Sequence, residues 1–389
     1  MTFKKAIGKI HLWLGLSSGL VVFIVALTGC IYVFQKEITE AIHHDTYFVT
    51  VSASARPLPV SRLAKAAQTA LGTDQPLNFF VAHRQPDRAW EFSAFKAGDP
   101  DALTYFSAIR YYRSVLINPY TAEVTGVVDH KYEFFNIVKY LHWSLLLNTP
   151  YGQPIVGIAT LIFVIMLISG MILWWPKKWN KTNINKSFKI KWKAGRKRVN
   201  YDLHNVSGFY GLLFTAILAL TGLVWAFDWF QKLVYVTAAL STAAPVNKEI
   251  SSLDSGKVVT VNALDRSFRY ADSLYPQADR IGVSMPFSGT AVYDISAYSG
   301  KEVYYHFDEL RFDQYSGRLL YSKPYAAKNR GEKLIGMNYD IHVGAVWGLP
   351  GKIIAFIAGL IAAGLPVTGF LIWLGRRKKK KYVPYKPAA

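Results

Sequence analysis

The sequence predicts an integral α-helical membrane protein, with four transmembrane helices from a duplicated two-helix unit and two α+β modules outside the membrane. Three observations carry this prediction: four long apolar runs, basic residues gathered at the ends of those runs, and motifs that recur in the two halves of the chain. The composition agrees, because 51% of the 389 residues are hydrophobic and 15% are aromatic, which is more than an ordinary soluble enzyme contains.

Four apolar runs of 19 to 23 residues are each long enough to cross the hydrocarbon core of a bilayer as a helix. They are Leu12–Phe34, Ile155–Trp175, Phe209–Phe227 and Ile353–Trp373. We therefore place the first transmembrane helix and the N-terminus in residues 1–35, and the other three helices in 151–175, 203–228 and 351–375.

The net charge of +20 comes from three stretches that adjoin these runs. Lys4–Lys9, Lys177–Arg198 and Arg376–Lys386 contain twenty basic residues and no Asp or Glu, and the other 25 basic residues match the 25 acidic ones. Because basic residues beside membrane helices stay in the cytoplasm, we expect cytoplasmic termini, a cytoplasmic loop at 176–202, a cytoplasmic tail at 376–389 and a bacterial inner membrane location. Nucleic-acid binding is not expected, because no recognisable reader motif accompanies the basic runs.

The two longer segments, 36–150 and 229–350, must then lie on the far side of the membrane. Each has the pattern of one amphipathic helix followed by strands, and each continues through a polar turn into a further strand, at 118–124 and 313–319. The first module has a predicted helix at Val60–Leu71 and strands at Asn78–His83, Ala89–Phe95 and Ser114–Asn118. The second has a predicted helix at Val261–Tyr275 and strands at Arg280–Met285, Ala291–Ser296 and Val303–Phe312.

Leu27-Thr28-Gly29-Cys30 matches a lipoprotein cleavage box, which is an alternative for the N-terminus. The apolar run continues past Cys30, and the Thr-Gly pair recurs at 221–222 without a cysteine, so helix packing by small residues explains the motif better. As the only cysteine, Cys30 also excludes an intrachain disulfide and a CxxCH haem attachment.

Two histidines recur at the same place in the two halves. His11 lies 17 residues before Thr28-Gly29, and His204 lies 17 residues before Thr221-Gly222. When a rare side chain keeps its position in both copies of a repeated segment, a ligand role is indicated.

A second pair of histidines opens the other two segments. His142 begins the segment that ends in Ser169-Gly170, and His342 begins the copy that ends in Thr368-Gly369, with offsets that differ by one residue. Gly152 and Gly351 follow these histidines, and we expect them in a turn before the membrane helix.

With cytoplasmic termini, His11 and His204 share a depth near the inner surface, and His142 and His342 share a depth near the outer one. A planar macrocycle between two helices needs one imidazole from each side and small residues nearby. We therefore predict two non-covalent b-type haems with these four histidines as axial ligands. The small residues on the face of the inner pair are Gly15 and Gly19 after His11, and Gly208 and Gly211 after His204.

Zinc is the alternative metal, and it would need a third or fourth ligand near each pair. The candidates are Asp202 and Asp340, each two residues before a histidine. That spacing places them on the opposite helix face, where they are better suited to capping the helices.

These features resemble a known family. The opening Lys-Ile-His-Leu-Trp-Leu-Gly-Leu at 9–16 and the turns NPYTAEV at 118–124 and DQYSGRL at 313–319 are similar to the PepSY-associated transmembrane proteins of bacterial inner membranes. The resemblance covers nearly the whole chain and is strongest to FoxB-type ferric-siderophore reductases. It implies PepSY-like periplasmic modules and a dihaem protein that reduces a ferric siderophore, or another ferric chelate, on the periplasmic side to release ferrous iron.

Residues and resemblance together favour transmembrane electron transfer. The chain has no GxGxxG fingerprint, and its loop at 176–200 is too short for a dinucleotide-binding domain. A membrane quinol or a separate reductase must therefore supply the electrons. The alternative is a haem-free PepSY membrane sensor or protease regulator that binds peptides. A transporter is disfavoured, because the spans carry almost no ionisable residues and are too few for an alternating pathway.

Overall fold

The computed structural model describes residues 2–51, 55–176, 178–243, 249–252, 262–301 and 303–377. The chain divides into two compact units. The helical unit comprises Met1–Val33, Val138–Phe230 and Ile341–Ala389, and the sheet unit comprises Phe34–Ile137 and Gln231–Asp340. Beyond Arg377 the predicted basic tail lies outside the described residues, as does Val261 of the second predicted helix.

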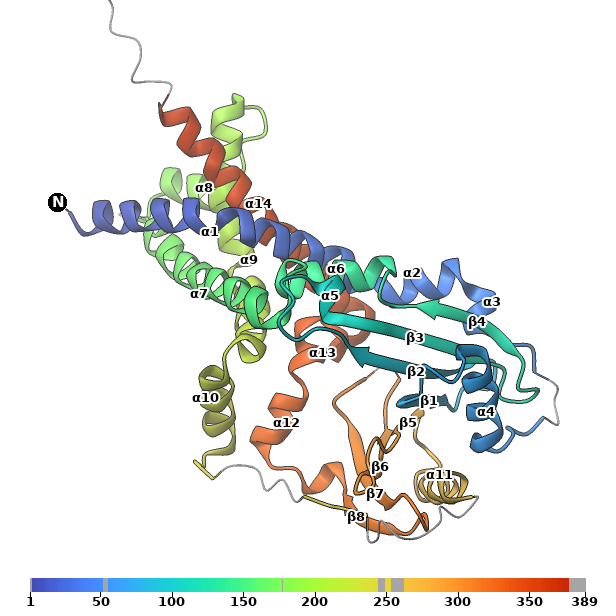
Figure 1. The fold of residues 1–389 in the computed structure, drawn as a ribbon. Coiled ribbons are helices and arrows are strands. Elements are labelled where there is room, and N and C mark those ends of the chain that lie inside the picture. Colours follow the sequence, from blue (N-terminus) through green and yellow to red (C-terminus); the bar gives the residue numbers. More distant parts are fainter. Residues whose placement is uncertain are drawn as a thin grey trace, which may run out of the picture. The chain divides into compact units, whose positions relative to one another are not determined.

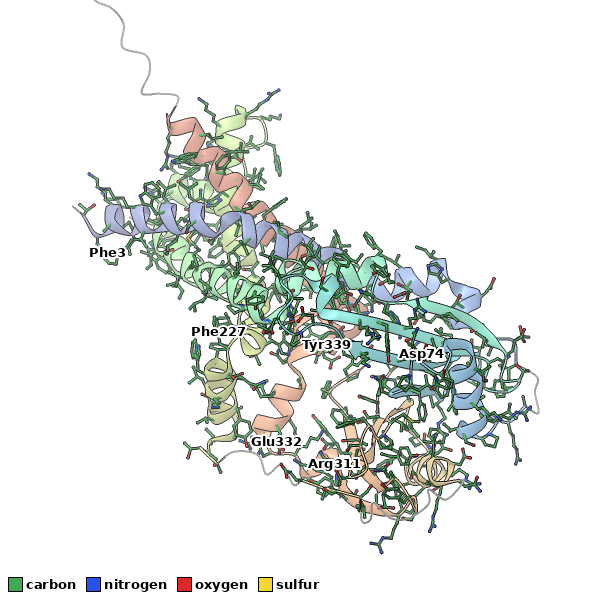
Figure 2. All side chains as sticks on the ribbon, in the orientation of Figure 1. Phe3, Asp74, Phe227, Arg311, Glu332 and Tyr339 are labelled. Carbon is green, nitrogen blue, oxygen red and sulfur yellow. The ribbon has the colours of Figure 1, made fainter. Side chains whose placement is uncertain are left out.

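Four long helices of the helical unit confirm the four predicted spans (Figure 1). They are α1 (Phe3–Val33), α7 (Thr149–Trp174), α9 (Arg196–Ala226) and α14 (Gly348–Arg377). Among the described residues these four are long and apolar enough to cross a membrane. Helix α1 packs on α7 and α14, and α9 packs on the same two helices. Figure 2 shows the side chains, with Phe3 marking the start of α1 and Phe227 the residue that follows α9.

Shorter helices flank the spans, and the apolar pattern did not predict them. They are α6 (Phe134–Ser144), α8 (Lys181–Phe188), α10 (Asp228–Ala239), α13 (Asn338–His342) and the 3₁₀ turn η2 (Ala345–Trp347). His142 and His342 lie on α6 and α13, so each is separated from its membrane helix by a break. The first break has positive φ at Leu145 and Leu146, and the second at Gly344 and Gly348.

The expectation that Gly152 and Gly351 form turns was wrong. Both lie in the first turns of α7 and α14. Backbone approaches closely there, since a Cβ on Gly152 would stand 2.0 Å from the Ser144 carbonyl oxygen, and one on Gly351 equally close to that of Gly344. The glycines thus let each helix begin directly against the preceding break.

The sheet unit contains one eight-stranded antiparallel sheet in the order β4-β3-β2-β1-β5-β6-β7-β8. The strands are β1 (Phe79–His83), β2 (Trp90–Ala97), β3 (Ile109–Ile117), β4 (Val124–Asp129), β5 (Arg280–Ser284), β6 (Val292–Tyr298), β7 (Phe307–Asp313) and β8 (Leu319–Lys323). The two predicted modules therefore share a sheet, joined where β1 pairs with β5 in a register that sets Phe80 opposite Val283.

Two amphipathic helices, α4 (Val60–Leu71) and α11 (Ala263–Leu274), contact each other and the strands. Leu63 and Ala67 are fully buried, because their spacing puts them on one face of α4, and the helix ends at Gly72 with φ of 82°. Strand β6 alternates buried and part-exposed residues, so one face of the sheet joins this core.

The remaining helical elements of the sheet unit are short. They are α2 (Gln35–Ile42), α3 (His44–Tyr47), α5 (Tyr105–Ala108), η1 (Tyr325–Ala327) and α12 (Arg330–Gly336). Helix α12 has a full capping box: the Asn329 side chain accepts from the Glu332 N–H, and the Glu332 carboxylate accepts from the Asn329 N–H.

Candidate functional site

Four histidine side chains of the helical unit lie in two facing pairs. The ring centroids of His11 on α1 and His204 on α9 are 6.4 Å apart, with an angle of 87° between the planes. Those of His142 on α6 and His342 on α13 are 5.9 Å apart, with an angle of 65°. The structure thus brings together the histidines that the sequence singles out, as two separate pairs.

The spacing within each pair is that of two imidazoles that share one metal ion. An imidazole nitrogen bonds a metal at about 2 Å and its ring centre lies about 1 Å farther back, so two opposed ligands have centroids about 6 Å apart. The distances of 6.4 and 5.9 Å agree with this value. Two imidazoles at this spacing could hold one metal ion, including a haem iron, between them.

The Nδ1 atom of each histidine is held by a neighbouring helix. Each Nδ1 lies 2.8 to 2.9 Å from an oxygen of that helix. The partners are the Ser169 hydroxyl for His11, the Val25 carbonyl for His142, the Thr368 hydroxyl for His204 and the Thr221 hydroxyl for His342. Such bonds on the remote nitrogen orient a ligating imidazole.

The direction of these bonds follows from the partner atoms. A carbonyl can only accept, so His142 Nδ1–H donates to Val25. The Thr221 hydroxyl already donates its proton to the Ile217 carbonyl at 2.7 Å, so its oxygen accepts from His342. With the proton on Nδ1, the lone pair of Nε2 is free to bind a metal.

A glycine lies over each histidine ring, next in sequence to a Ser or Thr. A Cβ added at these positions would stand 3.1 to 3.7 Å from the ring carbon Cε1. The contacts join Gly29 to His142, Gly170 to His11, Gly222 to His342 and Gly369 to His204. Each Ser/Thr-Gly pair thus lies at one histidine, with the glycine making room for the ring.

Sequence reasoning missed this role, since it assigned these pairs to helix packing alone. The signal that could have revealed it is their distribution. Each of the four membrane helices carries such a pair, at Thr28, Ser169, Thr221 and Thr368, and these pairs keep the same or nearly the same offset from the histidines in the two halves. The further pairs Ser18-Gly19 of α1 and Ser207-Gly208 of α9 do not share an offset from His11 and His204.

The four glycines predicted to flank the inner haem face other helices. An added Cβ would meet a side chain of α7 or α14 at 2.8 to 3.5 Å. These contacts join Gly15 to Met166, Gly19 to Pro366, Gly208 to Leu365 and Gly211 to Ile361. The glycines allow the helices to approach, and their part in haem binding stays a prediction.

A family model for the PepSY-associated TM region matches residues 9–376. The chain belongs to this family. The match spans all four histidines, the four membrane helices and the sheet unit, so the protein is a helical membrane protein with PepSY-like domains. A comparison with curated proteins gave no match.

In this PepSY-associated protein the aspartates considered as zinc ligands are engaged elsewhere. Asp202 accepts hydrogen bonds from Arg198 Nε and the Lys191 N–H, and Asp340 accepts from the Tyr304 N–H. Within the described residues, no group of three or more His, Cys, Asp or Glu side chains is placed to share a metal ion. A closed zinc site of four ligands therefore has no ligand set there.

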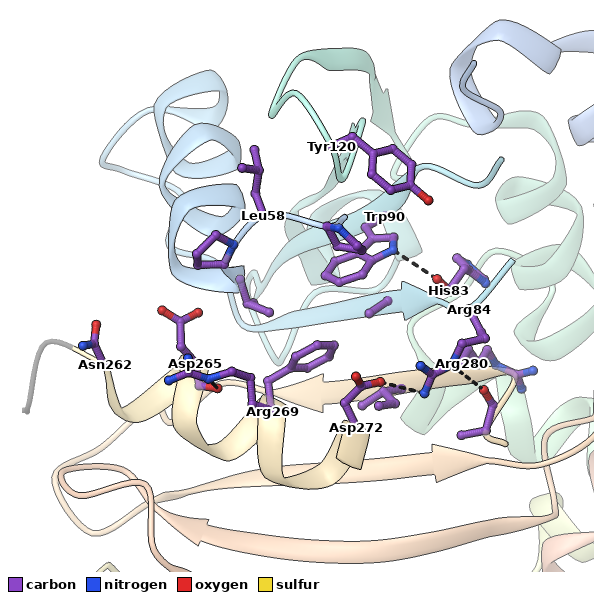
Figure 3. Close-up of a pocket in the computed structure, with 17 residues that line it drawn as sticks. Leu58, His83, Arg84, Trp90, Tyr120, Asn262, Asp265, Arg269, Asp272 and Arg280 are labelled. Carbon is purple, nitrogen blue, oxygen red and sulfur yellow. Dashed lines mark hydrogen bonds and ion pairs between the residues drawn. The ribbon is translucent and has the colours of Figure 1, made fainter. Parts of the chain in front are cut away.

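The sheet unit of this family member contains a cleft of about 630 Å³ between the two PepSY-like halves (Figure 3). One wall is the face of α11 that carries Asp265, Phe268, Arg269 and Asp272. The other contains the 57–60 segment before and at the start of α4, together with Trp90 and Tyr120. A cleft of this size and mixed character can hold a small molecule or a short peptide segment.

Polar side chains connect the two halves across the cleft. Arg84 and Asp272 form an ion pair at 2.6 Å. The Asp265 carboxylate accepts from both the N–H and the hydroxyl of Ser61 at the start of α4. His83 also lines the cleft, and burial, followed by the charges of Arg88 and Arg280, lowers the pKa of His83 to about 3. This histidine is therefore neutral at physiological pH.

Proposed function

We propose that this protein carries electrons across the bacterial inner membrane and reduces ferric iron on the periplasmic side. The substrate is a ferric siderophore or another ferric chelate, and the product is ferrous iron. His11 and His204 hold one b-type haem, and His142 and His342 hold a second. The observation that supports this most is the pair of facing imidazole sets, each with Nδ1 tied to a helix and Nε2 left free.

The chain's own residues have three tasks in this proposal. Each histidine presents a neutral Nε2 in a fixed direction, the glycine beside it leaves space for the ring, and the four apolar helices keep water away. When bound, haem supplies an iron that gains and loses one electron. Each ferric ion takes up one electron, and the ferrous ion binds less tightly to hard oxygen ligands. A membrane quinol that gives two electrons would reduce two ferric ions and release two protons.

The proposal includes a topology. The termini and the basic loop face the cytoplasm, as the clustered Lys and Arg indicate, and the sheet unit lies in the periplasm. The two halves arose by duplication, which is supported by the shared order of one helix and four strands in each half and by the repeated histidine positions. Within the family we place the protein with FoxB-type reductases.

The test begins with the absorption spectrum and pyridine haemochrome assay of the full chain, purified from cells supplied with haem. We expect a low-spin six-coordinate spectrum and about two haems per chain. His204→Ala and His142→Ala should each remove one haem, while His43→Ala, at an exposed histidine of the sheet unit, should remove none. In vesicles with a reduced quinol, the wild-type protein should then form ferrous iron from a ferric chelate. A folded protein without pigment would overturn the proposal.

The second candidate is a haem-free membrane sensor or protease regulator that binds peptides. The cleft between α4 and α11 favours it, because aromatic, proline and charged side chains line an open volume there. This candidate predicts a colourless protein whose fold does not depend on the four histidines. The haem content of the purified chain therefore separates the two functions.

A further inference from the structure

The connection between α7 and α9 is a folded surface rich in lysine. Six side chains form what we call the basic platform: Lys178, Lys181, Lys186, Lys189, Lys191 and Lys193. All six are exposed. The stretch 177–198 contains no Asp or Glu, and within the part of the chain that the structure describes no ion pair joins a platform lysine to an acidic side chain.

Aromatic packing holds the platform against the membrane helices. Trp174 at the end of α7 stacks on Phe209 of α9, with ring centroids 4.0 Å apart. Phe188 at the end of α8 meets both rings at 5.0 Å. The Trp174 indole N–H donates to the carbonyl of Ser187 at 3.1 Å. Helix α8 is therefore fixed beside the ends of two spans.

A buried carboxylate holds the second half of the platform. Asp202 of α9 is 1% exposed. It accepts from the Lys191 N–H at 3.2 Å and from Arg198 Nε at 2.9 Å. A charge is costly to bury unless it is paired, and here it orders the backbone that carries Lys189 and Lys193. The lysines are thus presented from a fixed surface.

Large apolar side chains are exposed among these lysines. Trp175 is 52%, Trp179 53% and Trp192 68% exposed, and Ile184 of α8 is 39% exposed. Tryptophan concentrates at the headgroup level of bilayers, and lysine side chains reach from that level toward phosphates. An acidic soluble protein would match the charge, but a lipid headgroup region matches both the charge and the exposed tryptophans beside the end of a span.

We propose that the basic platform binds the headgroups of anionic phospholipids in the bilayer that α7 and α9 span. The lysine ammonium groups donate to headgroup phosphate, and Trp175, Trp179 and Trp192 lie at the level of the glycerol backbone. This inference goes beyond electron transfer and does not depend on it, because the ligand is lipid and the contacts involve none of the four histidines.

The experiment compares phosphatidylglycerol with phosphatidylcholine on the purified full chain, by native mass spectrometry of lipid adducts during a titration. The test variant is the triple change Lys181→Gln, Lys186→Gln and Lys189→Gln. The matched control is Lys65→Gln, Lys96→Gln and Lys301→Gln, which removes three exposed lysines from the sheet unit. A third protein carries Lys→Arg at the three platform positions, which retains the charge.

A basic residue near an anionic surface contributes about fivefold in affinity. We therefore expect the wild type, the control and the arginine variant to prefer phosphatidylglycerol by about tenfold or more. The glutamine platform variant, which keeps three of the six lysines, should show a preference at least about fivefold smaller. An equal affinity of the wild type for the two lipids, or an unchanged preference in the glutamine variant, would overturn the proposal.

Discussion

Replacing Thr221 by Val tests whether the hydroxyl beside His342 helps to hold a haem ligand. The change keeps the side-chain shape and removes one acceptor, 2.8 Å from His342 Nδ1. A buried donor that loses its acceptor costs about 1–3 kcal/mol.

The expected magnitude follows from the loss of that one hydrogen bond. One neutral hydrogen bond contributes about 1 kcal/mol, which is about a fivefold change in an equilibrium constant. Loss of all outer bonds to a ligating histidine typically lowers metal affinity about 10- to 100-fold. We therefore expect Thr221→Val to lower the affinity for the outer haem at least about fivefold, and to leave the inner haem unchanged.

The assay is transfer of haem from the purified protein to excess apomyoglobin, with the two haems resolved as two phases. Thr215→Val is the matched control, because Thr215 also lies on α9 and donates to a carbonyl four residues earlier. Thr215 is buried, and no histidine is among its hydrogen-bond partners in the described residues. Both variants lose the hydrogen bond from the threonine hydroxyl to a carbonyl of the same helix. If the outer-haem phases of Thr221→Val and Thr215→Val agree within about twofold, the hydroxyl has no role at His342 and the reasoning fails.

Two further predictions concern other residues. Gly369→Ala should weaken binding of the inner haem and lower the free energy of unfolding by about 1–3 kcal/mol, because the added Cβ would stand 3.2 Å from His204 Cε1. Gly364→Ala on the same helix is the control and should be tolerated, because its Cβ would meet nothing within 4 Å. Equal haem loss from both variants would contradict a role of Gly369 in making room for the His204 ring. Because the pKa of His83 is lowered to about 3, the unfolded state binds more protons between pH 6.5 and 3, so stability falls as pH drops through that window, by on the order of 1 kcal/mol per pH unit. Chemical denaturation across this window should show a shallower pH dependence for His83→Gln than for the wild type, while the exposed-site control His43→Gln keeps the wild-type slope; equal slopes in all three proteins would contradict the shift.

Much of the local structure could be predicted, because periodicity reports which face of an element is buried. The spacing of Leu63, Ala66, Ala67 and Leu71 predicted α4 with the bounds that the structure shows. The membrane helices followed from apolar length, although α9 begins at Arg196, seven residues before the predicted 203, because Asp202 and Arg198 pair one helical turn apart and continue the helix into the basic loop.

The joining of the two modules could not be predicted in the same way. The contact pairs β1 with β5, which are about 200 residues apart in sequence. The alternation of residues in a strand shows which side chains face the core. It does not show which other strand will pair with the backbone N–H and C=O groups at its edge. The breaks after α6 were also hidden, since Leu145 and Leu146 adopt positive φ without a glycine to signal it.

The hydrogen-bond partners of the histidines could not be predicted from the sequence either. Sequence spacing singled out His11 and His204 together. It did not show that their hydrogen-bond partners lie on the other two membrane helices, at Ser169 of α7 and Thr368 of α14. The choice of Ser and Thr follows from the membrane setting. In a helix these hydroxyls can donate to the carbonyl three or four residues earlier, as Thr368 does to Gly364, which leaves an oxygen that can only accept. A transmembrane helix has no free backbone N–H or water to offer an imidazole, so its carbonyls and such hydroxyls provide acceptors. Acceptors of this kind bind the protonated Nδ1 and keep Nε2 as the free base, and this is the tautomer that metal ligation requires.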